Sequence, residues 1–235
     1  MSIPISFFED CAFVSVDFQG DAPEPGTRGE RMTKEKMLNV MLERGIDPDD
    51  INAAKDFATD VANPNAVKVA NACREIKMPM IFVHWGYMFK DAMDLDPIVY
   101  DHFVSEFGPD ASKWLGHHID SPNAFPMRQY DIRVGEYILP KTAMDAFPSS
   151  NIDYVLRNLK TQHIVFVGGN TGGCLGTTAY SARQRGYKTL IIEDATFDSV
   201  RSTQLQNIYA FGYDYLVKTK EFLALAESRL NLREM

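Results

Sequence analysis

Three residues with reactive side chains, Asp17, Lys141 and Cys174, stand at or just after the end of short apolar runs. A thiol at the start of a helix lies near the positive end of the helix dipole, which lowers its pKa, and a neighbouring ammonium lowers it further. A carboxylate beside the thiol can accept its proton and later give a proton to a leaving amine. The three groups together predict attack by Cys174 on a carbonyl carbon, with Asp17 as the proton shuttle.

The glycine-rich stretch GGNTGGC, residues 168–174, precedes the helix that Cys174 is expected to begin. The first N–H groups of a helix have no intrahelical partner, so in this turn they can form an oxyanion hole for a tetrahedral intermediate. The stretch lacks the GxxxxGK[ST] and GxGxxG patterns, and the sequence therefore does not favour a nucleotide phosphate site here.

Six short apolar runs, bounded by Gly, Pro or charged residues, alternate with segments of helical periodicity. The runs are typical of strands buried on both faces, and they cover residues 11–17, 79–85, 136–141, 163–169, 188–194 and 213–218. Helices are expected from the Asn63-Pro64 start signal to residue 76 and over residues 150–159, 174–185 and 202–211. The alternation predicts an α/β fold: one doubly wound, three-layer domain over residues 1–235 with a mostly parallel sheet.

Two segments stand outside this alternation. Residues 30–58 are expected to form a helical insert, with Met37, Leu38, Met41 and Leu42 on one face, which is either a helical extra or an oligomer contact. Residues 86–135 are expected to be irregular and functional, because long excursions are uncommon in compact domains.

Ligands of an open α/β sheet bind beyond the carboxyl ends of its strands, so we expect Asp17, Lys141 and Cys174 to meet at that edge. Each has an ordinary alternative role, as a turn cap, a solvated lysine or a buried thiol, but the joint pattern favours a site. The loop 114–130 is expected to carry a lid over this edge. Residues that follow the strands are candidate substrate contacts, and packing of the loops or solvation is the alternative role of each. These residues are Phe18, Gln19, His84, Trp85, Tyr87, Arg201 and Gln204.

Composition narrows the class of protein. The 235 residues are 45% apolar and 24% charged, which excludes a disordered chain. The net charge of −8, without a Lys/Arg-rich run, argues against binding to nucleic acid or to anionic membranes. No apolar stretch of about 18 residues exists, and the first residues lack a basic region, so we expect a cytoplasmic protein. Cys11, Cys73 and Cys174 have neither CxxC spacing nor the even number of a disulfide framework.

Three motifs occur in a specific order: FVSVDFQ, ILPKTAMDAF and GGNTGGCLGTTAYSARQRGYKTLIIEDAT. Over about residues 10–220 the sequence resembles the isochorismatase-like cysteine hydrolases, which include biuret and triuret hydrolases, ureidoacrylate amidohydrolase and N-carbamoylsarcosine amidohydrolase. The resemblance implies a six-stranded, mostly parallel sheet. It also implies a catalytic triad of Asp17, Lys141 and Cys174, a cis peptide bond between Gly169 and Asn170, and an oxyanion hole from the N–H groups of Asn170 and Cys174.

The departures from the family pattern bear on the reaction. Metal-containing nicotinamidases have an Asp-x-His motif after the second strand. Here the predicted strand 79–85 contains His84, but the motif is absent. His117 and His118 are adjacent in the sequence, and adjacent histidines rarely bind the same metal ion. We therefore expect no metal and no cofactor. True isochorismatases often lack the nucleophile, whereas Cys174 is present here.

The expected reaction is cleavage of a C–N bond in a small linear amide or carbamoyl compound through a thioester-type intermediate, which releases ammonia or an amine. Two alternatives remain open: a vinyl-ether or ester hydrolase, and a non-catalytic binding member of the same fold. The resemblance also implies a homodimer or homotetramer.

Overall fold

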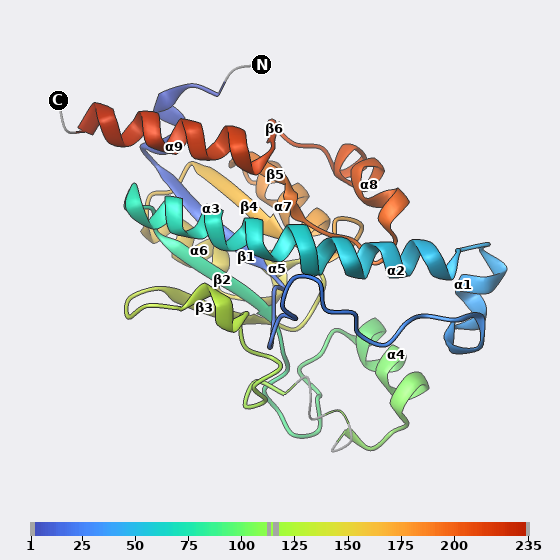
Figure 1. Ribbon diagram of the computed structural model, residues 1–235. Helices are drawn as coiled ribbons and strands as arrows, with labels where there is room; N and C mark the ends of the chain where they lie inside the picture. The colour runs from blue at the N-terminus through green and yellow to red at the C-terminus, as the bar shows by residue number, and fades with distance from the viewer. Residues whose placement is uncertain (1–2, 112–113, 115–117, 234–235) are drawn as a thin grey trace.

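A six-stranded parallel sheet forms the centre of the computed structural model, which describes residues 3–111, 114 and 118–233 (Figure 1). The strands lie in the order β3-β2-β1-β4-β5-β6, and every neighbouring pair is parallel. The sheet expected to be mostly parallel is thus entirely parallel. All six predicted strands are confirmed, with these bounds: β1 Cys11–Val16, β2 Met80–Trp85, β3 Tyr137–Lys141, β4 His163–Gly168, β5 Lys188–Thr196 and β6 Tyr215–Val217.

Helices cover both faces of the sheet, because successive strand residues point to opposite sides and both sides are apolar (Figure 1). Phe13 of β1 packs in the core under α3 and α9, whereas its neighbour Val14 packs in the core under α6, α7 and α8. The helices have these bounds: α1 Asn39–Glu43, α2 Pro48–Phe57, α3 Asn63–Glu75, α4 Pro97–Phe107, α5 Ala146–Ser149, α6 Ile152–Asn158, α7 Cys174–Gln184, α8 Gln204–Phe211 and α9 Thr219–Arg233. No helix among the described residues is both long and apolar enough to cross a membrane.

The Asn63-Pro64 signal is confirmed as the start of α3, which begins at Asn63, but helical structure already precedes it. The helical path begins at Pro48, where Asp47 caps α2 by accepting a hydrogen bond from the N–H of Asp49 at 2.9 Å. It continues through a π-helical turn, Ala58–Ala62, directly into α3. The wider turn falls immediately before Pro64, whose missing N–H and bulky ring do not fit a regular helix interior. The insert expected at 30–58 is therefore partly an extension of a core helix.

Residues 86–135, expected to be irregular, contain one regular helix, α4. Asp96 caps it by accepting a hydrogen bond from the N–H of Ile98 at 3.0 Å. Phe103 of this helix packs with Tyr87 and Trp114 in a small separate core. The sequence pattern also missed α9, in which Phe222 packs against the sheet.

A buried ion pair fastens the edge strand β3 to α3. The Arg74 guanidinium donates to both carboxylate oxygens of Glu136, at 2.6 and 2.9 Å, and the side chains are 6% and 9% exposed. Burial by itself raises the pKa of Glu136, but the hydrogen bonds from Arg74 and from the Arg133 N–H outweigh it, so the net pKa is lowered.

Replacing Glu136 by Gln should leave the Arg74 charge buried without its partner. We expect the free energy of unfolding at pH 7 to fall by about 3 kcal/mol, measured by urea denaturation. Because the folded-state pKa of Glu136 is lowered, its contribution is complete above about pH 4.3 and is lost as the pH falls through the folded value. The difference between wild type and variant should therefore shrink in acid. Glu75→Gln, on the exposed side of α3, is the control, and an equal loss in both variants would contradict the assignment.

Candidate active site

The structure brings together Asp17, Lys141 and Cys174, the three residues that the sequence pattern singled out. Asp17 follows β1, Lys141 ends β3, and Cys174 begins α7 after β4. The Lys141 ammonium lies 2.9 Å from Asp17 Oδ2 and donates to Cys174 Sγ at 3.1 Å. A third hydrogen bond, at 3.2 Å, goes to the carbonyl of Ala143. One cation thus contacts the carboxylate and the thiol at the carboxyl edge of the sheet.

The neighbourhood of Lys141 keeps it charged although its side chain is completely buried. Burial alone lowers the pKa of Lys141, but the adjacent Asp17 carboxylate and Cys174 sulfur outweigh burial and raise it. The ring of Trp85, at the end of β2, lies 4.5 Å from the ammonium and adds a cation–π contact. Trp85, predicted to contact substrate, therefore packs against the Lys141 ammonium.

The pKa of the Cys174 thiol differs from the value expected for a cysteine at the start of a helix. Burial raises the pKa of Cys174 to about 12, and the negative charge of Asp17 adds to the increase, while Lys141 lowers it by less. Water that would solvate a thiolate is excluded, and the helix terminus together with one ammonium does not compensate. The prediction of a lowered pKa is thus wrong, and the Cys174 thiol is neutral at pH 7.

Asp17 is oriented to receive that proton. Its backbone is left-handed, with φ of 55°, a conformation that Asp tolerates better than most residues. Its N–H donates to the carbonyl of Val83 at 2.9 Å, which fixes the turn after β1 against β2. Oδ2 contacts Lys141, whereas the buried Oδ1 accepts no hydrogen bond within the described chain. Lys141 therefore fixes Oδ2, whereas Oδ1 is available to accept a proton or a hydrogen bond.

The turn between β4 and α7 depends on close backbone packing. The peptide bond between Gly169 and Asn170 is cis, at the position that the family resemblance implies. Gly168 has φ of +118°, and a Cβ there would lie 2.0 Å from the Val16 carbonyl oxygen. Only glycine fits where the turn leaves the sheet beside β1.

Two N–H groups in this turn remain unpaired. The N–H groups of Thr171, Gly173 and Leu175 donate to backbone carbonyls, but in the described part of the chain those of Asn170 and Cys174 donate to none. These are the two groups that the resemblance assigns to the oxyanion hole. Unpaired N–H groups beside the nucleophile can stabilise negative charge that develops on a carbonyl oxygen.

Asp198, which sequence reasoning missed, holds this turn in place. Its Oδ2 accepts hydrogen bonds from Thr171 Oγ1 at 2.5 Å, from the Gly172 N–H at 2.7 Å and from Asn207 Nδ2 at 2.9 Å. The position just after β5, at the edge where the triad meets, was the available signal in the sequence. Asp198 therefore positions the residues that precede Cys174.

Two predicted substrate contacts, Phe18 and Gln19, line a cavity beside Asp17. Phe18 is 5% exposed and packs against the ring of Phe197, with centroids 5.1 Å apart. The Gln19 amide accepts from the Trp85 N–H at 2.9 Å and donates to the carbonyls of Trp85 and Ala124 at 2.9 and 2.8 Å. Gln19 thus ties β1 to β2 and has little bonding capacity left for substrate.

Other predicted contacts have different roles. Tyr87 is completely buried in the small core with α4. The buried Gln204 amide donates to the Thr196 carbonyl at 2.8 Å and accepts from Arg201 at 2.8 Å, so it holds the end of β5. Neither Tyr87 nor Gln204 presents a free group, and both expectations of substrate contact are corrected by this burial.

His84 and His118 take no part in the hydrogen bonds that join Asp17, Lys141 and Cys174. His84 is buried and stacks on Phe125, burial lowers its pKa, and its Nδ1 has no partner in the described chain. His118 lies within 3.1 Å of the Met88 carbonyl through Nε2. His117 and part of the expected 114–130 lid lie outside the described residues.

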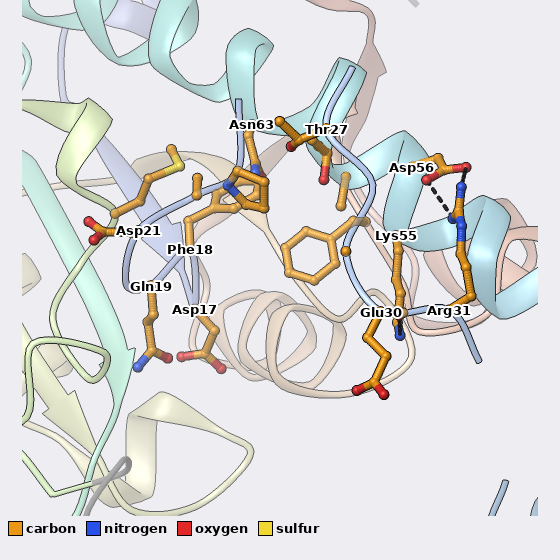
Figure 2. Close-up of a pocket in the computed structure, with 17 residues that line it drawn as sticks. Asp17, Phe18, Gln19, Asp21, Thr27, Glu30, Arg31, Lys55, Asp56 and Asn63 are labelled. Atoms are coloured by element: carbon orange, nitrogen blue, oxygen red, sulfur yellow. Dashed lines mark hydrogen bonds and ion pairs between the residues drawn. The ribbon is translucent and has the colours of Figure 1, made fainter. Parts of the chain in front are cut away.

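A cavity of about 460 Å³ is lined by Asp17 and Gln19 at the end of β1 and by Lys55 and Asp56 of α2. Figure 2 shows these residues. A second cavity, of about 350 Å³, is lined by Asn170 and again by Lys55. The segment expected to be a helical extra or an oligomer contact therefore supplies a wall of the site. Sequence spacing did not indicate this, because α2 approaches the sheet edge only through its tertiary packing.

The geometry can be compared with that of known proteins. An N-carbamoylsarcosine amidase from an Arthrobacter species is 23% identical over 154 residues, 62% of this chain and 53% of that protein. A ureidoacrylate amidohydrolase from Variovorax paradoxus is 30% identical over 81 residues, 33% of this chain and 32% of that protein. The chain thus aligns with about half of the first relative and about a third of the second.

The fold is shared with solved structures. A cysteine hydrolase from Pseudomonas syringae pv. phaseolicola has a TM-score of 0.65 and 18% identity, over 97% of this chain and 100% of that chain. The isochorismatase domain family matches residues 46–212, more than half of this sequence. The match spans Lys141 and Cys174 and leaves out Asp17, whose place in the site follows from its contact with Lys141. With an isochorismatase-like sheet and this match, the chain belongs to the isochorismatase family.

Proposed function

We propose that this protein is a metal-independent cysteine amidohydrolase that cleaves a C–N bond of a small linear amide or carbamoyl compound. The observation that carries the proposal is the contact of one buried ammonium with both the Cys174 thiol and the Asp17 carboxylate. This arrangement supports covalent catalysis, because it pairs a nucleophile with a proton acceptor and stabilises the charge that passes between them. The similarity to N-carbamoylsarcosine amidase and ureidoacrylate amidohydrolase supports the carbamoyl class.

The reaction begins with the neutral thiol. Asp17 takes the Cys174 proton as the sulfur attacks the substrate carbonyl, and Lys141 stabilises the thiolate as it forms. The N–H groups of Asn170 and Cys174 bind the resulting oxyanion. Asp17 then protonates the departing ammonia or amine, which leaves a thioester-type intermediate on Cys174. A water molecule that Asp17 deprotonates cleaves this intermediate and restores the thiol.

Ammonia release from a panel of amides tests the reaction. The panel contains biuret, triuret, N-carbamoyl amino acids, ureidoacrylate-like acids, maleamate and nicotinamide. We expect turnover of a carbamoyl compound that EDTA does not change and that Cys174→Ala lowers by about 10³-fold or more, because the nucleophile is lost. Cys73→Ala, a change at a buried thiol in α3, is the control. A vinyl ether and an ester are assayed beside the panel, and release of an enol or alcohol from them, without ammonia from any amide, would instead identify the vinyl-ether or ester alternative.

The raised pKa predicts how Cys174 reacts with iodoacetamide. With a pKa of about 12, the thiolate fraction and the alkylation rate should rise about tenfold per pH unit between pH 6 and pH 9. Asp17→Asn removes a negative charge beside the sulfur, so the variant should react faster than wild type at each pH. Mass spectrometry of the modified peptide measures both rates. A plateau below pH 8 would show a low-pKa thiolate and contradict the neutral resting thiol.

Asp198 is predicted to act through the turn that it holds. Asp198→Ala should lower kcat by about tenfold or more with a smaller change in KM, because the Asn170 N–H is no longer fixed relative to the sulfur. Thr203→Ala, which removes a hydroxyl that donates to the nearby carbonyl of Val200, is a control of similar size. Equal effects on kcat from both variants would argue that Asp198 contributes stability alone.

A further inference from the structure

Two buried polar atoms at the edge of the sheet that carries the triad have no hydrogen-bond partner in the described chain: Asp17 Oδ1 and His84 Nδ1. Buried polar atoms in proteins nearly always have a partner, so each exception calls for an explanation. The other two such side-chain atoms of the described chain, His163 Nδ1 and Arg229 Nε, lie at the start of β4 and in α9. Asp17 follows β1 and His84 is the next-to-last residue of β2, so this pair lies near the reacting groups.

The sheet register places Asp17 and His84 side by side. The pairing of β1 with β2 sets Val16 against Val83, and the Asp17 N–H donates to the Val83 carbonyl at 2.9 Å. The next residues along the two strands are Asp17 and His84. The Asp17 carboxylate and the Lys141 ammonium also shift the pKa of His84, in opposite directions, which is an effect that charges exert at short range inside a protein. His84 therefore borders the triad.

The His84 ring is tightly packed and is uncharged at pH 7. The residue is 3% exposed, and its ring stacks on that of Phe125, with centroids 5.9 Å apart and planes 15° apart. Burial lowers the pKa of His84 below its ordinary value of 6.5, and this outweighs the carbonyls of Ala124 and Trp85, which favour the charged ring. A neutral imidazole carries one proton, which belongs on Nε2 because an N–H at Nδ1 would be buried without an acceptor. Nδ1 is then a hydrogen-bond acceptor.

Two acceptors on neighbouring residues fit a molecule that offers two donors. A carboxylate oxygen only accepts hydrogen bonds, and so does Nδ1 in this tautomer. The second half of the proposed reaction needs such a molecule, because water has to attack the thioester that the departing amine leaves behind. A water molecule that donates both of its O–H groups keeps its lone pairs for the attack. The pair of acceptors thus fixes the orientation of the water as well as its position, which lowers the entropic cost of the attack.

We propose that His84 orients the hydrolytic water, which donates one O–H to Asp17 Oδ1 and the other to His84 Nδ1. Asp17 takes the first proton as the water oxygen forms a bond to the thioester carbonyl carbon. The C–S bond then breaks, and Asp17 returns that proton to Cys174 Sγ. The second proton leaves with the acid product, so His84 neither gains nor loses a proton. This assignment rests on the covalent intermediate of the proposed function and adds one residue to its second half.

Partition of an acyl-enzyme between water and methanol tests the assignment. The ester p-nitrophenyl acetate acylates an active thiol without an ammonia-forming step, and Cys174→Ala gives the background. Deacylation in aqueous methanol then releases acetate or methyl acetate. Methanol has one O–H, so it can donate to Asp17 but not to both acceptors. We expect His84→Phe, which keeps a ring against Phe125, to lower the ratio of acetate to methyl acetate about tenfold, because only water loses a hydrogen bond. A general loss of structure would slow both products alike, and His84→Leu replaces His84→Phe if that variant does not fold.

Two further variants complete the test. His84→Asn should keep the wild-type ratio, because the Asn side-chain oxygen lies two bonds beyond Cβ, as Nδ1 does, and also accepts hydrogen bonds. His163→Phe, at the other histidine with an unpartnered Nδ1, is the matched control at the start of β4 and should leave the ratio unchanged. A ratio that His84→Phe does not change, or that His84→Asn lowers equally, would overturn the assignment. A ratio that depends on His84, without ammonia from any amide of the panel, would keep it and reject the amidohydrolase. Absence of acylation at Cys174 would overturn both.

Discussion

The buried ammonium of Lys141 is the interaction on which the rest of the site depends. A fully buried charge without partners costs several kcal/mol, so the surrounding chain must supply a carboxylate and further acceptors at hydrogen-bond distance. Asp17, Cys174 and the Ala143 carbonyl do so from three separate segments, and the Trp85 ring covers the ammonium. This requirement fixes the ends of β1, β2 and β3 and the start of α7 relative to one another.

The same burial determines the state of the nucleophile. Exclusion of water strengthens the contact between Lys141 and Asp17, and it also disfavours the thiolate of Cys174, so that the thiol stays protonated in the resting protein. In the proposed reaction the sulfur therefore loses its proton during attack rather than before it. A paired carboxylate with one free oxygen is suited to this task, because the proton acceptor is already in place when the substrate carbonyl arrives.

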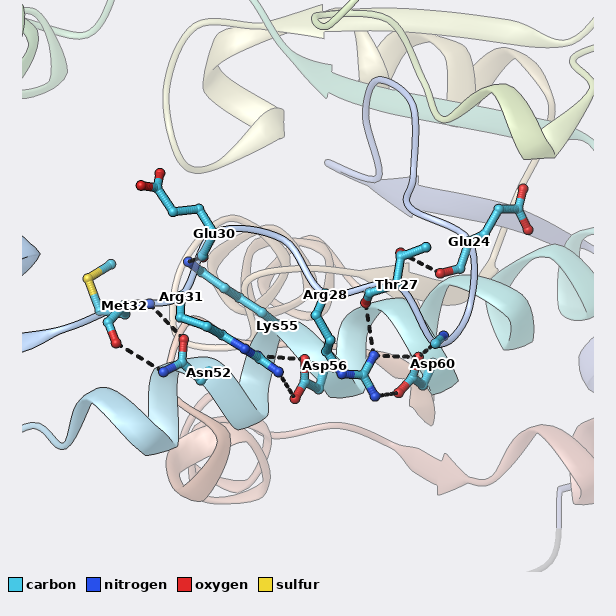
Figure 3. A network of polar contacts seen from close by, with 11 residues as sticks. Glu24, Thr27, Arg28, Glu30, Arg31, Met32, Asn52, Lys55, Asp56 and Asp60 are labelled. Carbon is cyan, nitrogen blue, oxygen red and sulfur yellow. Dashed lines mark hydrogen bonds and ion pairs between the residues drawn. The ribbon is translucent and has the colours of Figure 1, made fainter.

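The Asp17–Lys141–Cys174 cluster and the wall of the adjoining cavity come from different parts of the fold. The triad and the unpaired N–H groups lie at the carboxyl edge of the sheet, whereas much of the cavity wall comes from α2 and from the segment that Arg28 and Arg31 fasten to it (Figure 3). Since α2 continues through the π-helical turn into the core helix α3, this wall is attached to the same core that supports the sheet.

The sequence by itself determined the six strands, the helices α3, α6, α7 and α8, and the grouping of Asp17, Lys141 and Cys174 at one edge of the sheet, but not α9. Apolar runs and helical periodicity are local signals that can be recognised in the sequence. Because parallel strands present their carboxyl ends at one edge of the sheet, residues that follow different strands can be predicted to lie close together. Tertiary structure decided the roles of the other candidate residues and the path of the helices around the site, because both depend on contacts between distant segments. It engaged the amides of Gln19 and Gln204 in backbone hydrogen bonds, buried Tyr87 under α4, joined α2 to α3 across Pro64, and brought Lys55 to the cavity. It also raised the pKa of Cys174, since the position at a helix start is visible in the sequence but the loss of water around the sulfur is not.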